Sequence, residues 1–174
     1  PVRIQQTHIL TGLGVAMDGA WAHAHPWLAV TSADGTVRVW DSPEALTFRT
    51  LAPAFAEHAN AVTWSPDDRF LAAGDFHGDV AIWDVASGAI VRRLPGTSQQ
   101  IQSLAWSPDG TLLAAASWDF TVRVWNPATG ALLHTLNDHR DCATAVAWSP
   151  DSHWLATGGN DDAIYVYHVP NWTH

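Results

Sequence analysis

The sequence has no lysine, one cysteine and only two glutamates among its 174 residues. All eight cations are arginines, and 17 acidic residues give a formal net charge of −9. This balance excludes the basic stripe that nucleic-acid binding requires, so we expect no nucleic-acid partner. Cys142 stands alone, which excludes an internal disulfide and suits a reducing compartment, so we expect a cytoplasmic protein.

Long apolar runs and helical patterns are also missing. No apolar run approaches the roughly 18 residues of a membrane-spanning helix, so we expect no membrane partner. Fifteen of the 17 acids are aspartates, which favour turns, whereas glutamate favours helices. Hydrophobic residues still make up 47% of the chain, enough for a packed core. The composition therefore favours a folded protein of the all-β class.

Eleven tryptophans are present, and most of them recur at a fixed period. One series, with steps of 43, 42 and 42 residues, comprises Trp21, Trp64, Trp106 and Trp148. A second aromatic series with the same steps comprises Trp40, Trp83, Trp125 and Tyr167. Two independent series with equal steps indicate four copies of one structural unit.

Each unit has the pattern of short strands joined by tight turns. Ser-Pro-Asp turns follow three of the first-series tryptophans, at residues 65–68, 107–110 and 149–152. Proline and aspartate both favour such turns. Residues 121–125 alternate β-branched side chains with others, as a half-buried strand does. We therefore predict a four-stranded antiparallel meander in each copy.

These units resemble WD40 repeats. The Trp-Asp pair typical of that family stands at Trp40-Asp41 and Trp83-Asp84, and becomes Trp125-Asn126 and Tyr167-His168 in the later copies. The resemblance implies an all-β, WD40-type β-propeller with four blades in this chain.

The resemblance also implies a buried hydrogen-bond network of His, Ser or Thr, Asp and Trp in each blade. The matching positions form three groups, which are Ser32, Asp34 and Trp40; Ser117, Asp119 and Trp125; and His139 with Asp161. Gly159 occupies the Ser/Thr position of the last copy. Because His139 and Asp161 fall on network positions, we read them as structural and expect no catalytic residue and no enzyme.

The whole chain, residues 1–174, is predicted to form a single half-propeller domain. The blades are expected at about residues 15–51, 59–94, 101–136 and 143–169. Residues 2–10 are expected to be an outer strand that is donated to a last blade, because they resemble the segment before the fourth copy.

Four blades form only part of a typical propeller ring. The end blades carry as many apolar residues as the middle ones, so each end face is expected to pack on another blade. Two solutions remain. Two chains close one eight-bladed ring as a homodimer, each donating residues 2–10 to the other, or the chain is part of a longer propeller. We favour the homodimer, because the strand phase is complete at both ends.

The face that carries the turns between second and third strands is here called the top face. Five residues there are predicted to contact a protein or peptide partner: Phe76, Trp118, Asn160, Gln100 and Gln102. We therefore expect a non-catalytic binding scaffold. The alternative is a self-assembling or subunit-completing half-propeller whose main role is ring closure, or a fragment of a larger WD40 protein.

Histidines gather on the opposite face. His23, His25, His153, His168 and His174 are all expected there. Their spacing matches no standard metal site and no cysteine helps, so we interpret them as solvated turn histidines. We expect no metal and no cofactor.

Overall fold

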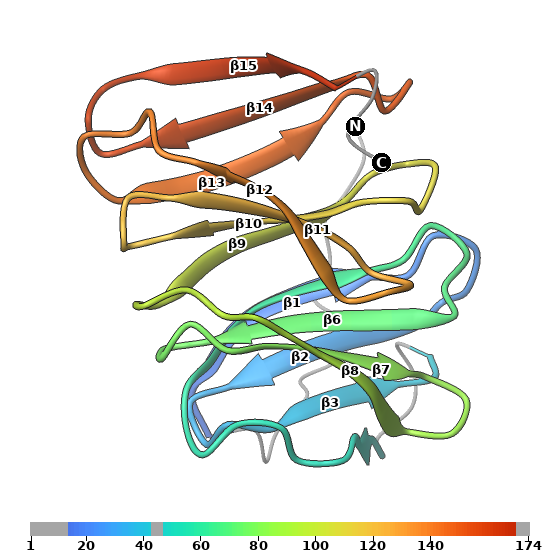
Figure 1. The fold of residues 1–174 in the computed structure, drawn as a ribbon. Helices are drawn as coiled ribbons and strands as arrows, with labels where there is room; N and C mark the ends of the chain where they lie inside the picture. The colour runs from blue at the N-terminus through green and yellow to red at the C-terminus, as the bar shows by residue number, and fades with distance from the viewer. Residues whose placement is uncertain (1–13, 43–46, 170–174) are drawn as a thin grey trace, which may run out of the picture.

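The computed structural model describes residues 14–42 and 47–169. These residues form fifteen strands in four antiparallel sheets, and no helix occurs among them. Figure 1 shows the four sheets, which we call blades 1 to 4 in chain order. This confirms the predicted all-β, four-bladed fold. The expected outer strand at residues 2–10 lies outside the described residues.

The strands follow one another in the order of the chain. Blade 1 comprises β1 (Ala16–Trp21), β2 (Leu28–Ser32), β3 (Val37–Trp40) and β4 (Arg49–Thr50). Blade 2 comprises β5 (Ala59–Trp64), β6 (Phe70–Asp75), β7 (Val80–Asp84) and β8 (Ala89–Leu94). Blade 3 comprises β9 (Ile101–Trp106), β10 (Leu113–Ser117), β11 (Val122–Asn126) and β12 (Ala131–Leu136). Blade 4 comprises three strands within the described residues, β13 (Ala143–Trp148), β14 (Trp154–Gly159) and β15 (Ile164–His168).

The first strand of each blade has a β-bulge near its start. The register between the first and second strands slips at equivalent places in all four blades. The extra residues are Met17, Asn60, Gln102 and Thr144. A bulge twists a strand and redirects its side chains. Each blade therefore redirects one side chain at the equivalent position of its first strand.

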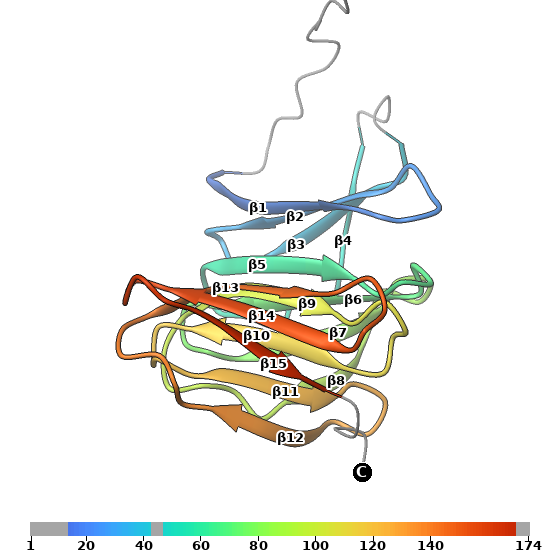
Figure 2. The ribbon, with the colours of Figure 1, turned by 90° about the horizontal axis from the view of Figure 1, so that it is seen from above.

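The blades pack face to face, with the first strands β1, β5, β9 and β13 side by side. Three apolar clusters fill the three junctions between successive blades. Figure 1 shows blade 4 (red) at one end of the stack, and Figure 2 shows blade 1 (blue) at the other, so the described blades form an open arc. The core is therefore divided among junctions, as in other repeat proteins.

Tryptophans of the first series build two of these junctions. The Trp64 indole is buried, and its Nε1–H donates to the backbone oxygen of Ala20 in blade 1 at 2.9 Å. Trp148 Nε1–H donates in the same way to the oxygen of Ala105 in blade 3 at 3.0 Å. Trp106, at the middle junction, differs because its Nε1 is buried without a partner. This position thus bonds blade 2 to blade 1 and blade 4 to blade 3.

At the middle junction, Gly74 of blade 2 leaves space for the side chain of Ile101 in blade 3. A Cβ on Gly74 would lie only 2.6 Å from Cγ2 of Ile101 in blade 3. Gly158 has the equivalent position in blade 4, and a Cβ there would meet only the Cβ of Ala145 at 3.8 Å. The two glycines therefore differ in what they face, because no described blade follows blade 4.

We predict that Gly74→Ala lowers the free energy of unfolding by about 1–3 kcal/mol, because the added methyl overpacks the junction. Gly158→Ala serves as the matched control and should change that free energy by less than about 0.5 kcal/mol. Urea denaturation followed by tryptophan fluorescence measures both. Equal effects of the two substitutions would contradict the assigned packing.

Candidate functional site

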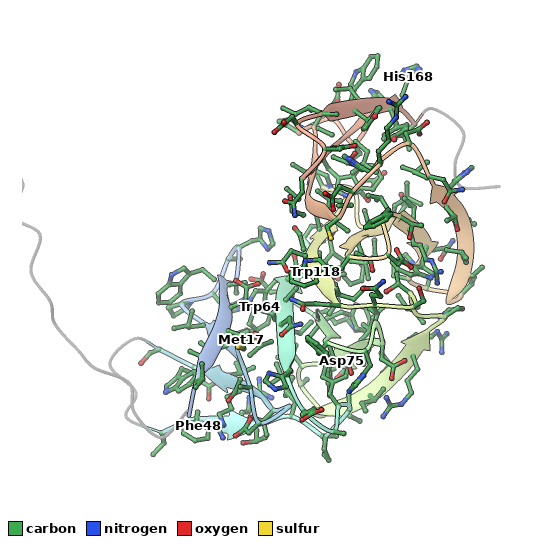
Figure 3. The ribbon with its side chains drawn as sticks, turned by 90° about the vertical axis from the view of Figure 1, so that its left-hand side faces the viewer. Met17, Phe48, Trp64, Asp75, Trp118 and His168 are labelled. Carbon is green, nitrogen blue, oxygen red and sulfur yellow. The ribbon has the colours of Figure 1, made fainter. Side chains whose placement is uncertain are left out.

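The turns that follow the second strands place aromatic side chains on the top face. Phe76 and Trp118 are exposed at these turns in blades 2 and 3, and Asn160 is exposed at the turn of blade 4. Figure 3 looks onto this face, with Trp118 labelled. The Trp118 N–H donates to the backbone oxygen of Gln100 at 3.0 Å, so the turn is fixed while its indole remains accessible.

Two glutamines extend this surface toward the first strand of blade 3. Gln100 Nε2–H donates to Oε1 of Gln102 at 2.9 Å, and Gln102 is the bulged residue of β9. The structure thus brings Trp118, Gln100 and Gln102 together in one blade. Phe76 and Asn160 stand on the flanking blades, where Phe76 packs against the rings of His58 and His77.

Phe120 is a further aromatic residue at the blade 3 turn that the sequence reasoning missed. Its ring is exposed, and its φ of 72° lies in the left-handed region. The equivalent residues in blades 1 and 2 are Gly35 and Gly78, which adopt such angles freely. A bulky residue there is strained by about 1–3 kcal/mol. A change from the glycine of two blades to phenylalanine was the signal in the sequence.

The network of blade 4 is built around His139. Its Nδ1 lies 3.0 Å from Oδ1 of Asp161, and its Nε2 lies 2.9 Å from the hydroxyl of Thr157. The Arg140 backbone N–H donates to Asp161 and, together with His139, holds the pKa of that carboxyl below its usual range.

Thr157, rather than the position of Gly159, supplies the hydroxyl in blade 4. A Cβ on Gly159 would lie 2.5 Å from Nδ1 of His139. The glycine at the Ser/Thr position therefore makes room for the histidine ring.

The other two predicted networks form in part. Ser117 accepts from the Asp119 N–H at 3.1 Å, but its own hydroxyl donates toward Gln99 and Thr97 in the preceding loop. Trp125 Nε1 is buried without a partner, so the expected participation of Trp125 is wrong.

In blade 1, Asp34 accepts from Thr36 and pairs with Arg38 at 2.8 Å. The Asp34 N–H also donates to Ser32 Oγ at 3.3 Å, so the Ser32–Asp34 part of the network is present. The Trp40 ring packs against Phe48 at a centroid distance of 5.1 Å.

Two of the histidines on the opposite face are not simply solvated. The side chain of Asp68, buried in the turn between β5 and β6 of blade 2, accepts from the N–H groups of His23, Ala24 and His25. Nδ1 of His23 and of His25 lie 3.1 and 2.9 Å from its oxygens. Burial opposes ionisation of Asp68, but these donors outweigh it and hold the pKa of the carboxyl well below its usual range.

His23 and His25 are turn residues whose side chains are 56% and 48% exposed, as the sequence indicated, and they also join blade 1 to blade 2 through Asp68. His153 lies 3.4 Å from Asp151, and His168 packs on Trp154 at 4.4 Å between ring centroids. His174 lies outside the described residues. Among residues 14–42 and 47–169, no group of three or more His, Cys, Asp or Glu side chains is arranged to hold a metal ion.

The repeats match a known family along most of the chain. The model of the WD domain, G-beta repeat matches residues 2–41, 50–84, 88–126 and 130–168. The chain belongs to the WD40 repeat family. WD40 repeats are protein-interaction scaffolds, and no helix in the described part of this chain is long and apolar enough to cross a bilayer.

Three WD40 relatives show how the chain compares with longer proteins. It is 29% identical over 96 residues to telomerase protein component 1 of Rattus norvegicus, covering 55% of this chain and 4% of that protein. It is 36% identical over 78 residues to the probable cytosolic iron-sulfur protein assembly protein Ciao1 of Culex quinquefasciatus, covering 43% and 23%. Protein tipD of Dictyostelium discoideum is 33% identical over 70 residues, covering 38% and 11%. The match thus spans less than a quarter of each relative.

We predict that Asp68→Asn lowers the free energy of unfolding by about 1–3 kcal/mol at pH 7, because the buried acceptor loses its charge. The folded-state pKa of Asp68 is lowered, so its contribution is present above the ordinary aspartate pKa of about 4 and is lost as the pH falls below it.

Wild-type stability should therefore fall more steeply below about pH 4 than that of the variant, as measured by urea denaturation across pH. Asp41→Asn is the control, since Asp41 is exposed and lies 3.7 Å from Arg49. Parallel pH profiles for wild type and Asp68→Asn would contradict the assigned role.

Proposed function

We propose that this chain is a non-catalytic WD40 scaffold that binds a protein or peptide through its top face. The observation that carries the proposal is the exposed, left-handed Phe120 beside Trp118 at the turn of blade 3. Strain of this kind persists where the surrounding structure enforces it, and it concentrates at functional sites. Exposed aromatic rings on a fixed turn are good anchors for a partner.

Polar groups beside these rings support the same role. Gln100, Gln102 and Asn160 offer both donors and acceptors, which suits backbone groups of an extended peptide. The net charge of −9 favours a partner with a basic surface, since complementary charge speeds encounter and limits wrong partners. The single Cys142 is compatible with the proposed cytoplasmic location.

The His139–Asp161 pair supports a structural role rather than catalysis. The His139 side chain is buried, and both of its ring nitrogens are engaged within blade 4. A general base needs one nitrogen within reach of a substrate proton. We therefore assign this pair to holding the loop before β13.

Ring completion, with a second copy or with further blades of a larger WD40 protein, is a second candidate function. It is favoured by the two end blades, which expose apolar side chains at positions that are buried in the middle blades. This role uses the end faces of the arc and leaves the top face free, so the two functions are compatible.

We predict that Phe120→Gly weakens partner binding without weakening the fold. Selection of a phage-displayed random peptide library on the wild-type chain supplies the ligands. Their affinity for Phe120→Gly and for Trp118→Ala should fall at least about tenfold. The free energy of unfolding of Phe120→Gly should stay equal or rise by up to about 1 kcal/mol, because strain is removed.

Leu132→Ala is the matched control, because Leu132 is exposed on the outer strand of the same blade. It should keep the affinity of the wild type. Failure to select any peptide, or peptides that bind Phe120→Gly and Trp118→Ala as tightly as wild type, would contradict binding at the top face.

A further inference from the structure

We propose that a cleft between blades 2 and 3 binds a small, uncharged aromatic molecule, with the indole N–H of Trp106 donating to an acceptor atom of that molecule. The cleft has a volume of about 580 Å³ and lies on the opposite face, between turns of the two blades. Small-molecule sites typically have volumes of about 300–1,000 Å³. This site is separate from the top face and from the end blades, so it is independent of both functions proposed above.

The middle junction differs from the other two junctions in its tryptophan. Trp64 and Trp148 each donate to a backbone oxygen of the preceding blade, at 2.9 and 3.0 Å. The equivalent acceptor for Trp106 is the backbone oxygen of Thr63. Within the described part of the chain, however, Nε1 of Trp106 is buried and has no hydrogen-bond partner. A buried donor without a partner is destabilising, so an acceptor that reaches this N–H favours the bound state.

The turn of blade 3 also lacks a side chain that joins the other blades. The residue after Ser-Pro-Asp is Asp68 in blade 2 and Ser152 in blade 4, and each accepts from backbone N–H groups of the preceding blade. Gly110 has this position in blade 3. All three adopt left-handed backbone, with φ of 57°, 63° and 74°. A Cβ on Gly110 would lie 3.9 Å from Cδ of Pro66 in blade 2, so a side chain there would enter the cleft.

The walls of the cleft are largely apolar. Phe70, Ile82 and Val91 of blade 2 line it together with Trp106 and Pro127 of blade 3. The two aromatic rings can stack on a flat ligand. Trp106 also lines a second hollow of about 370 Å³. An indole with open space beside it and an N–H without an acceptor can turn that N–H toward a ligand.

The charged side chains of the cleft are already engaged within the protein. Asp67 and Asp109 each accept from the hydroxyl of the serine two residues earlier. Arg69 pairs with Asp84 at 3.5 Å, and the guanidinium of Arg92 donates to a backbone oxygen of blade 3 at 2.7 Å. The group that remains is the indole N–H, which an acceptor can serve and a cation cannot. The net charge of −9 disfavours an anion, so the site suits an uncharged ligand.

Matched probes in NMR titrations test the class of ligand. Quinoline and naphthalene have the same shape and differ in one ring nitrogen, and acetophenone supplies a carbonyl acceptor. Quinoline or acetophenone should bind with a dissociation constant of about 1 mM or tighter, and quinoline should bind at least about fivefold more tightly than naphthalene. Benzoate and benzylamine are the charged probes, and each should bind at least about fivefold more weakly than acetophenone.

Two substitutions test where the probes bind. Gly110→Asn keeps the left-handed turn, which asparagine tolerates, and should weaken quinoline binding at least about fivefold by obstructing the cleft. Gly88→Asn is the matched control, because Gly88 has a φ of 69° and its Cβ would meet only Leu51 at 3.9 Å, outside the cleft. It should keep the affinity of the wild type. Trp106→Phe should reduce the affinity for quinoline to that for naphthalene.

Hydrogen exchange of the indole N–H groups tests the state of the free chain. The N–H of Trp106 should exchange faster than those of Trp64 and Trp148, and quinoline should slow it. Equal protection of all three would show that Trp106 already has an acceptor in the junction, and would overturn the proposal.

The binding outcomes are equally decisive. Failure of quinoline and acetophenone to bind below about 5 mM, tighter binding of a charged probe, or unchanged affinity in Gly110→Asn would each overturn the proposal. Binding of the uncharged probes that is weakened in Gly110→Asn, retained in Gly88→Asn and insensitive to the ring nitrogen in Trp106→Phe would establish the site. None of these outcomes bears on binding at the top face.

Discussion

The packing of each sheet on the preceding one is the interaction on which the rest of this structure depends. No blade has a core of its own, because the three apolar clusters all lie between blades. A tryptophan at the end of the first strand crosses two of these junctions and donates to the neighbour's backbone. Stability is then a sum over junctions, and a blade without a neighbour loses the packing of one face.

The same stack holds the top face in place. Each turn between the second and third strands is held by a loop of its own blade, as Trp118 is held by Gln100, and the blades fix one another. This rigidity allows blade 3 to carry Phe120 at a backbone angle where blades 1 and 2 carry glycine. On the opposite face, Asp68 holds the histidine loop of blade 1 against blade 2. The loops on both faces are thus held in place by blades that pack on one another.

The blades were predictable from the sequence because their signals are local and repeated. The tryptophan series and the Ser-Pro-Asp turns recur every 42 or 43 residues, so the strands assigned in one repeat can be assigned in the next. The details that escaped prediction depend on contacts between segments. Thr157 supplies the hydroxyl because Gly159 leaves space for His139, which no spacing reveals. Asp68 binds His23 and His25, which precede it by 45 and 43 residues, across the junction of blades 1 and 2. Trp125 Nε1 is buried without a partner, and the Ser117 hydroxyl donates to the Gln99 backbone oxygen instead.

Hydrogen exchange across a dilution series tests most directly the claim that each blade is stabilised by its neighbours. At low concentration, amides of β1 and β15 should exchange much faster than those of β6 and β10, whose residues are almost all buried. Raising the concentration should slow exchange in the two end blades and leave the middle blades unchanged. Equal protection of all four blades in the monomeric chain would contradict the account, because each blade would then be stable without its neighbour.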